Sequence, residues 1–209
     1  MVVKSFRFRA TSGLFAMLWI LALAPRTAFA AGSPRDVVRE LSDKVIAVLQ
    51  EKGLSADAKR EQIRGIVQGY VDFATMSRLV LARNWASLSD SQKSEFAEEF
   101  KQHLSVVYGK NVESYNNEKV QITGDRDEGR GDWTVQTKIV RPQGGADILV
   151  DYRLRQIDGD WKIIDLIIER VSLVSNFRSQ FQEVMANGGI EKLLQLLREK
   201  NAAGQPLKS

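Results

Sequence analysis

The sequence predicts an α+β domain in which helices come first, a four-stranded antiparallel sheet follows, and helices close the chain. Two changes of period indicate this order. Apolar residues recur at helical spacing up to Asn116, and from Val120 to Leu154 they alternate with polar residues. Short turn signals separate the alternating runs, which favours a meander of neighbouring strands. Helices and strands that stand in separate blocks are typical of the α+β class.

The N-terminus has the order of a secretory signal peptide. Basic residues precede a mainly apolar run, Ala10–Ala24, and the small-x-small triplet Ala28–Ala30 follows. The run is too short for a membrane anchor, because about 15 residues at about 1.5 Å each cover only part of a hydrocarbon core about 30 Å thick. We therefore expect residues 1–30 to be removed on export.

Export changes the charge of the protein. The removed segment carries Lys4, Arg7, Arg9 and Arg26 and no acidic residue, so the 30 basic residues of the chain fall to the number of its acidic ones, 26. A nucleic-acid-binding protein is expected to keep a basic surplus, and this argues against nucleic acid as a partner. The chain has no cysteine, so its stability has to come from a hydrophobic core.

Three helices are predicted before the sheet. Apolar residues stand at helical spacing after Pro34, and a second amphipathic stretch continues from Ile63 towards Val80. A long helix begins at Ser89, because Ser89 and Gln92 have the spacing of a capping box. Its apolar face is formed by Phe96, Phe100, Leu104 and Val107.

The strands are predicted from alternation and from the turns between them. We expect turns at Asp125–Gly131, Pro142–Gly145 and Asp158–Gly159. The last strand, Trp161–Glu169, is apolar on both faces, so both of its sides must be covered. Its alternation puts one set of side chains on one face and a second set on the other: Ile164, Leu166 and Ile168 against Trp161, Ile163 and Ile167.

Such a sheet has two possible interiors. Strongly twisted strands with long helices packed across one side tend to form an open cone, in which one face of the sheet lines a pocket. The same residue types would equally suit a completely filled core, and the sequence leaves both interpretations open.

The chain is expected to end in two helices. The first spans residues 175–186, Gly188–Gly189 interrupt it, and the second carries an apolar face formed by Ile190, Leu193, Leu194 and Leu197. We expect one domain over residues 31–203 and a flexible tail over residues 204–209. A third class of function, a pure interaction module, would use this terminal helix to dock a partner.

Two charged residues stand out in the apolar C-terminal part. Asp165 alternates with isoleucines, and Arg178 lies on the following helix. A buried aspartate needs a partner, so we expect either an Asp165–Arg178 ion pair or backbone amides that cap Asp165. The alternative hypothesis is an enzyme, an isomerase or dehydratase that uses Asp165 as a base with Tyr108 or Tyr152 as its oxyanion partner.

Other catalytic and metal chemistry has little support. His103 is the single histidine, which argues against a catalytic triad or a multi-histidine metal site, and we interpret it as a structural residue. No Walker or dinucleotide-binding glycine pattern follows a predicted strand. We therefore expect no catalytic residue, no metal and no cofactor.

Two segments resemble the MlaC-like, or toluene-tolerance, family. They are Phe73–Trp85, followed by the helix after Ser89, and Asp158–Asp165, followed by Val171–Phe181. The resemblance covers most of the mature chain. It implies a periplasmic phospholipid carrier with an NTF2-like or cystatin-like fold, whose cavity holds the acyl chains of its cargo.

The resemblance also implies partners. Members of the family shuttle lipid between an outer-membrane lipoprotein complex and an inner-membrane ABC transporter with an MCE-type subunit, and so maintain outer-membrane lipid asymmetry. The sequence departs from the family pattern at Phe177, where tyrosine is expected, and at Ala82, where glycine is usual. A hopanoid-associated branch of the same family is the alternative for the cargo.

A lipid carrier has to hide its cargo from water. A two-chain lipid has about 30 methylenes at about 0.8 kcal/mol each, so leaving them in water costs on the order of 20 kcal/mol. The predicted cavity wall consists of apolar residues on the sheet and the helices that face it: Phe73, Met76, Val80, Val107, Tyr108, Val135, Ile139, Ile148, Val150, Ile164, Leu166, Ile168, Phe177 and Phe181.

Overall fold

The structure is a computed structural model that describes residues 32–142 and 144–207. The expected signal peptide, residues 1–30, lies outside the described residues. Within the described ranges, no helix combines the length and the apolar character needed to cross a membrane.

The helices follow the predicted order. They are α1 (Pro34–Gln50), α2 (Ala56–Tyr70), α3 (Phe73–Leu81), α4 (Asp90–Gly109) and α5 (Leu173–Ala202), with short 3₁₀ helices η1 (Ala82–Ser87) and η2 (Lys110–Ser114). The capping box that opens α4 is confirmed, because the Ser89 amide donates to Gln92 Oε1 over 3.0 Å and the Gln92 amide donates to Ser89 Oγ over 3.2 Å. Gly189, at φ 66° and ψ −166°, interrupts α5 at the predicted break.

The sheet is antiparallel throughout, with strand order β1-β2-β3-β4-β5. Its strands are β1 (Lys119–Gly129), β2 (Asp132–Val140), β3 (Ile148–Ile157), β4 (Asp160–Ile168) and β5 (Val171–Ser172). The four-stranded meander is thus confirmed, with β5 as an additional short edge strand. The first turn is shorter than predicted, because β1 continues through Asp125 to Gly129 and leaves only Arg130–Gly131 between the strands.

A β-bulge changes which residues of β4 share a face. Arg153 of β3 pairs with Asp165, but the next residue, Leu154, pairs with Ile163, so Ile164 has no partner across the ladder. The predicted grouping of Ile164 with Leu166 and Ile168 is therefore wrong. Ile163 takes its place on the face that Leu166 and Ile168 share.

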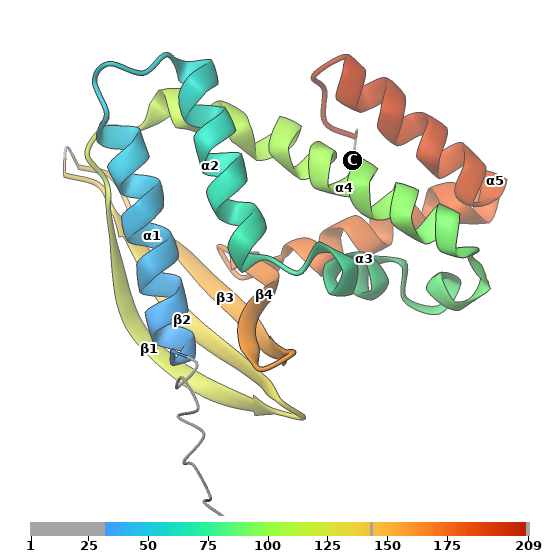
Figure 1. The fold of residues 1–209 in the computed structure, drawn as a ribbon, viewed down its shortest axis with the longest axis horizontal. Coiled ribbons are helices and arrows are strands. Elements are labelled where there is room, and N and C mark those ends of the chain that lie inside the picture. Colours follow the sequence, from blue (N-terminus) through green and yellow to red (C-terminus); the bar gives the residue numbers. More distant parts are fainter. Residues whose placement is uncertain (1–31, 143, 208–209) are drawn as a thin grey trace, which may run out of the picture. The chain divides into compact units, whose positions relative to one another are not determined.

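The helices form two groups around this sheet (Figure 1). α1 and α2 lie side by side over one face of the strands, and their contacts with the sheet include Val38 and Leu41 against Val135, Leu154 and Ile163. α3, α4 and α5 pack on one another around a second core.

The second core is centred on four phenylalanines. Phe96 and Phe100 of α4 meet Phe177 and Phe181 of α5, with ring centroids between 5.1 and 5.7 Å apart. All four side chains are buried. This cluster joins α4 to α5, since aromatic pairs at such distances are favourable beyond the area they bury.

Helix α2 differs from the other long helices, because none of its residues is fully buried. It contains two glycines, Gly65 and Gly69, and open space surrounds the position of a Cβ at each of them. A glycine inside a helix costs about 1 kcal/mol relative to alanine, and close packing does not require either glycine here. α2 thus covers its neighbours without burying any residue fully, and at its C-terminal end Lys162 Nζ of β4 donates to the Gly69 carbonyl over 2.9 Å.

The C-cap of α3 is strained. Ala82 has φ 48° and ψ −119°, a conformation that glycine adopts readily and a side chain with Cβ does not. We expect Ala82→Gly to raise the free energy of unfolding by about 1 kcal/mol, since the relieved strain exceeds the added entropy of the unfolded chain. Urea unfolding of the two proteins measures this change. An unchanged or lower midpoint would show that the backbone here carries no strain.

His103 is buried where α4 meets the end of α5. Its Nδ1 donates to Asn201 Oδ1 over 2.9 Å, because the Asn201 amide nitrogen is already directed to Glu99. Its Nε2 accepts from the Leu207 amide over 3.4 Å. Residues 204–207, part of the expected flexible tail, therefore return to the domain, and residues 208–209 lie outside the described residues.

This environment makes stability dependent on pH. Burial lowers the pKa of His103 below its ordinary value of 6.5, and the hydrogen bond with Asn201 opposes that shift only in part. The unfolded chain therefore binds the proton more readily, and stability is lost as the pH falls below 6.5. We expect the wild type to lose about 1 kcal/mol more than His103→Gln between about pH 7 and about pH 5. Chemical unfolding at both pH values measures these losses. Equal losses of unfolding free energy in the wild type and His103→Gln would refute this role of His103.

Candidate binding cavity

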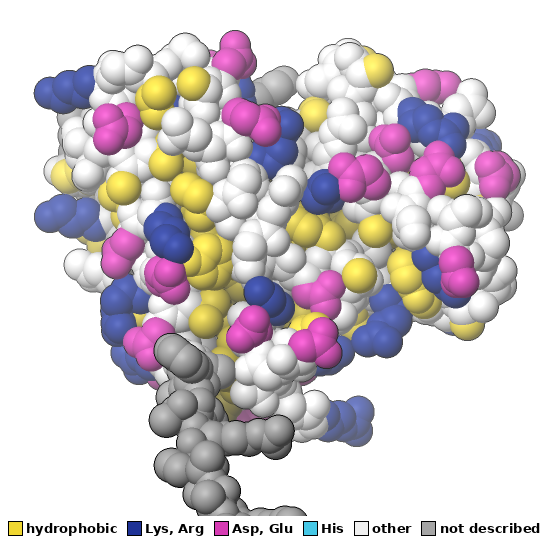
Figure 2. All heavy atoms as spheres, in the orientation of Figure 1, with side chains coloured by type: hydrophobic (Ala, Val, Ile, Leu, Met, Phe, Trp, Pro, Cys, Tyr) yellow, Lys and Arg dark blue, Asp and Glu magenta, His cyan; other side chains and the backbone are white. Residues whose placement is uncertain are grey.

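A cavity of about 680 Å³ lies between the sheet and helices α1, α2, α3 and α4. Its volume falls within the range of about 300–1,000 Å³ that is typical of small-molecule sites. In the view of Figure 2, apolar atoms reach the surface in a band between α1 and α2, so the cover over this interior is incomplete. The sequence did not decide between a pocket and a filled core on this face of the sheet, and the structure has a cavity there.

The cavity lining is largely aliphatic. The sheet supplies its floor, with Ile139, Ile148, Val150, Ile163, Leu166 and Ile168. The helices supply its walls, with Leu41, Val45, Ile46 and Leu49 from α1, Ile63 and Val67 from α2, Phe73 and Met76 from α3, and Leu104 and Tyr108 from α4. Such a lining favours a ligand with long apolar segments.

The structure brings part of the predicted wall together. The members that line the cavity are Phe73, Met76, Tyr108, Ile139, Ile148, Val150, Leu166 and Ile168. The predicted set was chosen for apolar character, and these members also face the space between the sheet and the helices.

The remaining members lie elsewhere, each for a local reason. Phe177, Phe181 and Val80 belong to the core of the helical group, and Val135 packs in the core beneath α1. Ile164 stands at the bulge of β4, and Val107 lies on α4 outside the lining. Apolar character alone placed these six in the wall, and packing assigns them to other surroundings.

Sequence reasoning missed the contribution of α1 and α2. The sequence predicted apolar helix faces in these two segments but placed none of their residues in the cavity wall, although Leu41, Val45, Ile63 and Val67 line it. One signal could have identified α2, namely its two interior glycines beside a polar outer face, because tightly packed amphipathic helices seldom combine these features.

Three hydroxyls, those of Ser42, Tyr108 and Tyr152, are among the polar groups of the cavity lining. Burial raises the pKa of Tyr152 above its ordinary value, against a smaller opposing effect of a hydrogen bond with Ser42, and burial also raises the pKa of Tyr108. Both phenols are therefore neutral at physiological pH. Ser42 donates to the Val38 carbonyl over 2.7 Å, which satisfies its own hydroxyl within α1. These three hydroxyls add polarity to the cavity without adding charge, and the charges of its lining come from other residues.

Asp165 lies outside the cavity lining and is held by hydrogen bonds. It is buried, its Oδ1 accepts from the Val174 amide over 3.0 Å, and its Oδ2 accepts from Ser172 Oγ over 2.5 Å. The predicted ion pair with Arg178 is wrong: the Arg178 guanidinium instead donates twice to the Leu79 carbonyl, over 2.7 and 3.0 Å. The amide-capping alternative describes Asp165 correctly.

We expect Asp165→Asn to lower stability without affecting ligand content. The charge-assisted bonds from Ser172 and Val174 join β4 to the start of α5, and losing the charge should cost about 1–3 kcal/mol. Thermal unfolding and lipid extraction from the same preparation measure both quantities. If Asp165→Asn stayed fully stable but no longer retained lipid, Asp165 would have a role in ligand binding and not in stability.

Within the described part of the chain, no three histidine, cysteine, aspartate or glutamate side chains form a group that could hold a metal ion.

Known proteins resemble this chain over most of its length. The family model described as MlaC protein matches residues 39–199. The intermembrane phospholipid transport system binding protein MlaC of Haemophilus influenzae is 24% identical over 192 residues, covering 88% of this chain and 89% of that protein. The toluene tolerance protein ttg2D of Pseudomonas putida is 25% identical over 178 residues, covering 83% and 82%.

A solved structure has the same fold. It is the phospholipid-binding protein from Ralstonia solanacearum in complex with a phospholipid, which is 22% identical to this chain and superimposes with a TM-score of 0.73. The match covers 81% of this chain and 97% of that protein. The α+β architecture therefore recurs in a distant sequence.

Proposed function

The chain belongs to the MlaC family, and from that premise we propose that it is a periplasmic phospholipid carrier of an intermembrane lipid transport system. The observation that carries this proposal is the cavity of about 680 Å³, which is lined by aliphatic side chains of α1, α2 and the sheet. Two relatives of this chain are named for phospholipid transport and for toluene tolerance, and the similar solved structure holds a phospholipid.

The physical task explains the cavity. Leaving both tails of a lipid in water costs on the order of 20 kcal/mol, and burial against apolar walls removes most of that cost. The phospholipid is then cargo and not a cofactor. We propose no catalytic step, and the location of Asp165 outside the cavity removes the main support for the enzyme alternative.

The partners belong to the same proposal. We propose that residues 1–30 direct export, that an outer-membrane lipoprotein complex and an inner-membrane ABC transporter with an MCE-type subunit exchange lipid with the carrier, and that this exchange maintains outer-membrane asymmetry. A carrier between two membranes must release its cargo to partners, and α2, which lines the cavity without a fully buried residue, suits that requirement.

Native mass spectrometry of the mature protein tests this function. The protein is purified from periplasm without detergent, its intact mass is recorded, and extracted lipids are identified. We expect a bound glycerophospholipid. A hopanoid or another polycyclic lipid would assign the cargo to the alternative branch. A protein that is free of lipid and also refuses added lipid would overturn the carrier function.

A further inference from the structure

Three cations stand at the cavity where α2 meets α4. Arg60 and Arg64 of α2 and Lys101 of α4 belong to its lining, together with the uncharged Gln68 and Ser105. Each cation has an acidic partner outside the lining: Asp57 and Glu113 for Arg60, Glu61 for Arg64, and Glu98 for Lys101. The cavity therefore has a cationic inner edge and an acidic outer edge here.

Exposure supports this inward and outward division. The side chains of Arg60 and Lys101 are 29% and 23% exposed and that of Arg64 is 46% exposed, and each is less exposed than its acidic partners, which are 62–90% exposed. Carboxylates in water are screened, and such surface pairs contribute little. The cations consequently keep most of their capacity to bind an anion that approaches from the cavity.

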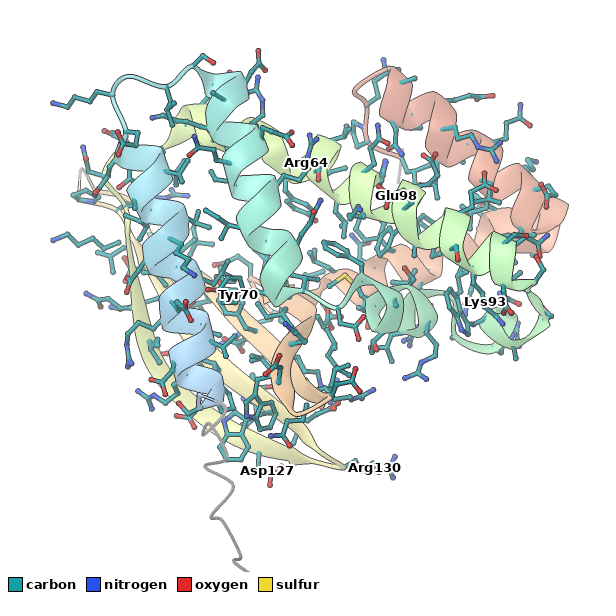
Figure 3. All side chains as sticks on the ribbon, in the orientation of Figure 1. Arg64, Tyr70, Lys93, Glu98, Asp127 and Arg130 are labelled. Carbon is teal, nitrogen blue, oxygen red and sulfur yellow. The ribbon has the colours of Figure 1, made fainter. Side chains whose placement is uncertain are left out.

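Both helices border the cavity here, and polar side chains of each belong to its lining. In Figure 3, Arg64 projects from α2 towards α4, on which Glu98 lies. The Arg60 side chain lies over the end of α4, since a Cβ added at Gly109 would be 3.6 Å from its Cδ. Among the residues that the structure describes, no hydrogen bond or ion pair joins α2 to α4, so no polar bond has to break when a group enters this seam.

The other polar part of the lining lacks this charge. At the ends of β1 and β2, Arg141 is accompanied in the lining by an acid, Glu118, so the two charges balance. The seam between α2 and α4 has three cations and no acid in the lining. A negatively charged head group attached to buried tails is therefore most stable at this seam.

We propose that Arg60, Arg64 and Lys101 bind the phosphate of the cargo lipid at the seam between α2 and α4. This inference rests on the proposed carrier function and adds the chemical group that the carrier recognises. Guanidinium groups match phosphate oxygens with paired hydrogen bonds, and the lysine adds a point charge. The carrier consequently selects phosphate-bearing lipids over uncharged lipids with the same tails.

A competition between two lipids tests the phosphate site. Delipidated protein is offered equimolar dioleoyl-phosphatidylglycerol and dioleoylglycerol in mixed micelles, and native mass spectrometry gives the ratio in which they bind. We expect the wild type to favour the phosphate-bearing lipid about tenfold or more. R60Q/R64Q/K101Q should bring the ratio close to unity, and R60K/R64K should keep most of the preference.

Matched controls separate this site from general charge effects. R39Q/K93Q/R198Q removes the same kinds of side chain from ion pairs outside the cavity lining and should leave the ratio unchanged. R64Q/K101Q keeps Arg60 with its link to η2 and should still reduce the preference if the triple variant does not fold.

The outcomes are distinguishable from failure of the carrier function. Equal binding of both lipids by the wild type, or an unchanged preference in R64Q/K101Q, would overturn the phosphate site while the carrier function stands. Uptake of neither lipid by the wild type would overturn the carrier function and the site with it.

Discussion

Val150→Trp is expected to yield a folded protein that retains at least tenfold less lipid than the wild type. Val150 lies on β3 in the floor of the cavity and is only 7% exposed. Its backbone carbonyl, which accepts from Thr137 Oγ1 over 2.7 Å, is unaffected by the substitution. The indole can project into existing space instead of displacing packed atoms, so it competes with acyl chains at a modest cost in stability.

The neighbouring residue supplies the control. Leu149 precedes Val150 on the same strand, is 42% exposed and lies outside the lining, because successive side chains of a strand point to opposite faces. Leu149→Trp adds a larger aromatic side chain at the outer face and should leave lipid content unchanged. Lipid extraction from equal amounts of folded protein measures both variants. Equal lipid content in Val150→Trp and the wild type would remove Val150 from the wall.

The order of elements could be predicted from the sequence because local signals determine it. The capping box at Ser89, the glycines within α5 and the change of period after Asn116 each act over a few residues, and the structure bears them out. The bulge between Arg153 and Leu154 could not be predicted in this way, since it depends on the pairing of two strands. That bulge exchanged Ile164 for Ile163 in the cavity.

The candidate site was predicted in part for a related reason. A cavity wall and a packed core require the same apolar residue types, so composition did not separate Ile168 from Phe177. The distinction depends on which elements meet: α5 packs its phenylalanines against α4, whereas α2 and the sheet both border the cavity. Contacts of that kind join residues far apart in the sequence, and no local pattern encodes them.

Phe181→Ala is expected to lower the free energy of unfolding by about 3–5 kcal/mol, a large part of the about 5–15 kcal/mol that stabilises a typical domain. Phe181 is 1% exposed, and its ring lies 5.6 Å from those of Phe96, Phe100 and Phe177. Removing it leaves a void bounded by three rings on two helices, which cannot collapse without moving α5 away from α4.

The same substitution at Phe73 separates core from cavity. Phe73 is half-buried and lines the cavity, so Phe73→Ala should cost less stability and should weaken lipid retention. Phe181→Ala should show the opposite, with a lower unfolding temperature and unchanged lipid per folded molecule. Chemical unfolding measures the stability of both variants, and lipid extraction measures the lipid that each retains. If Phe181→Ala lost lipid while keeping its stability, the helical core would have to be redrawn as part of the cavity wall.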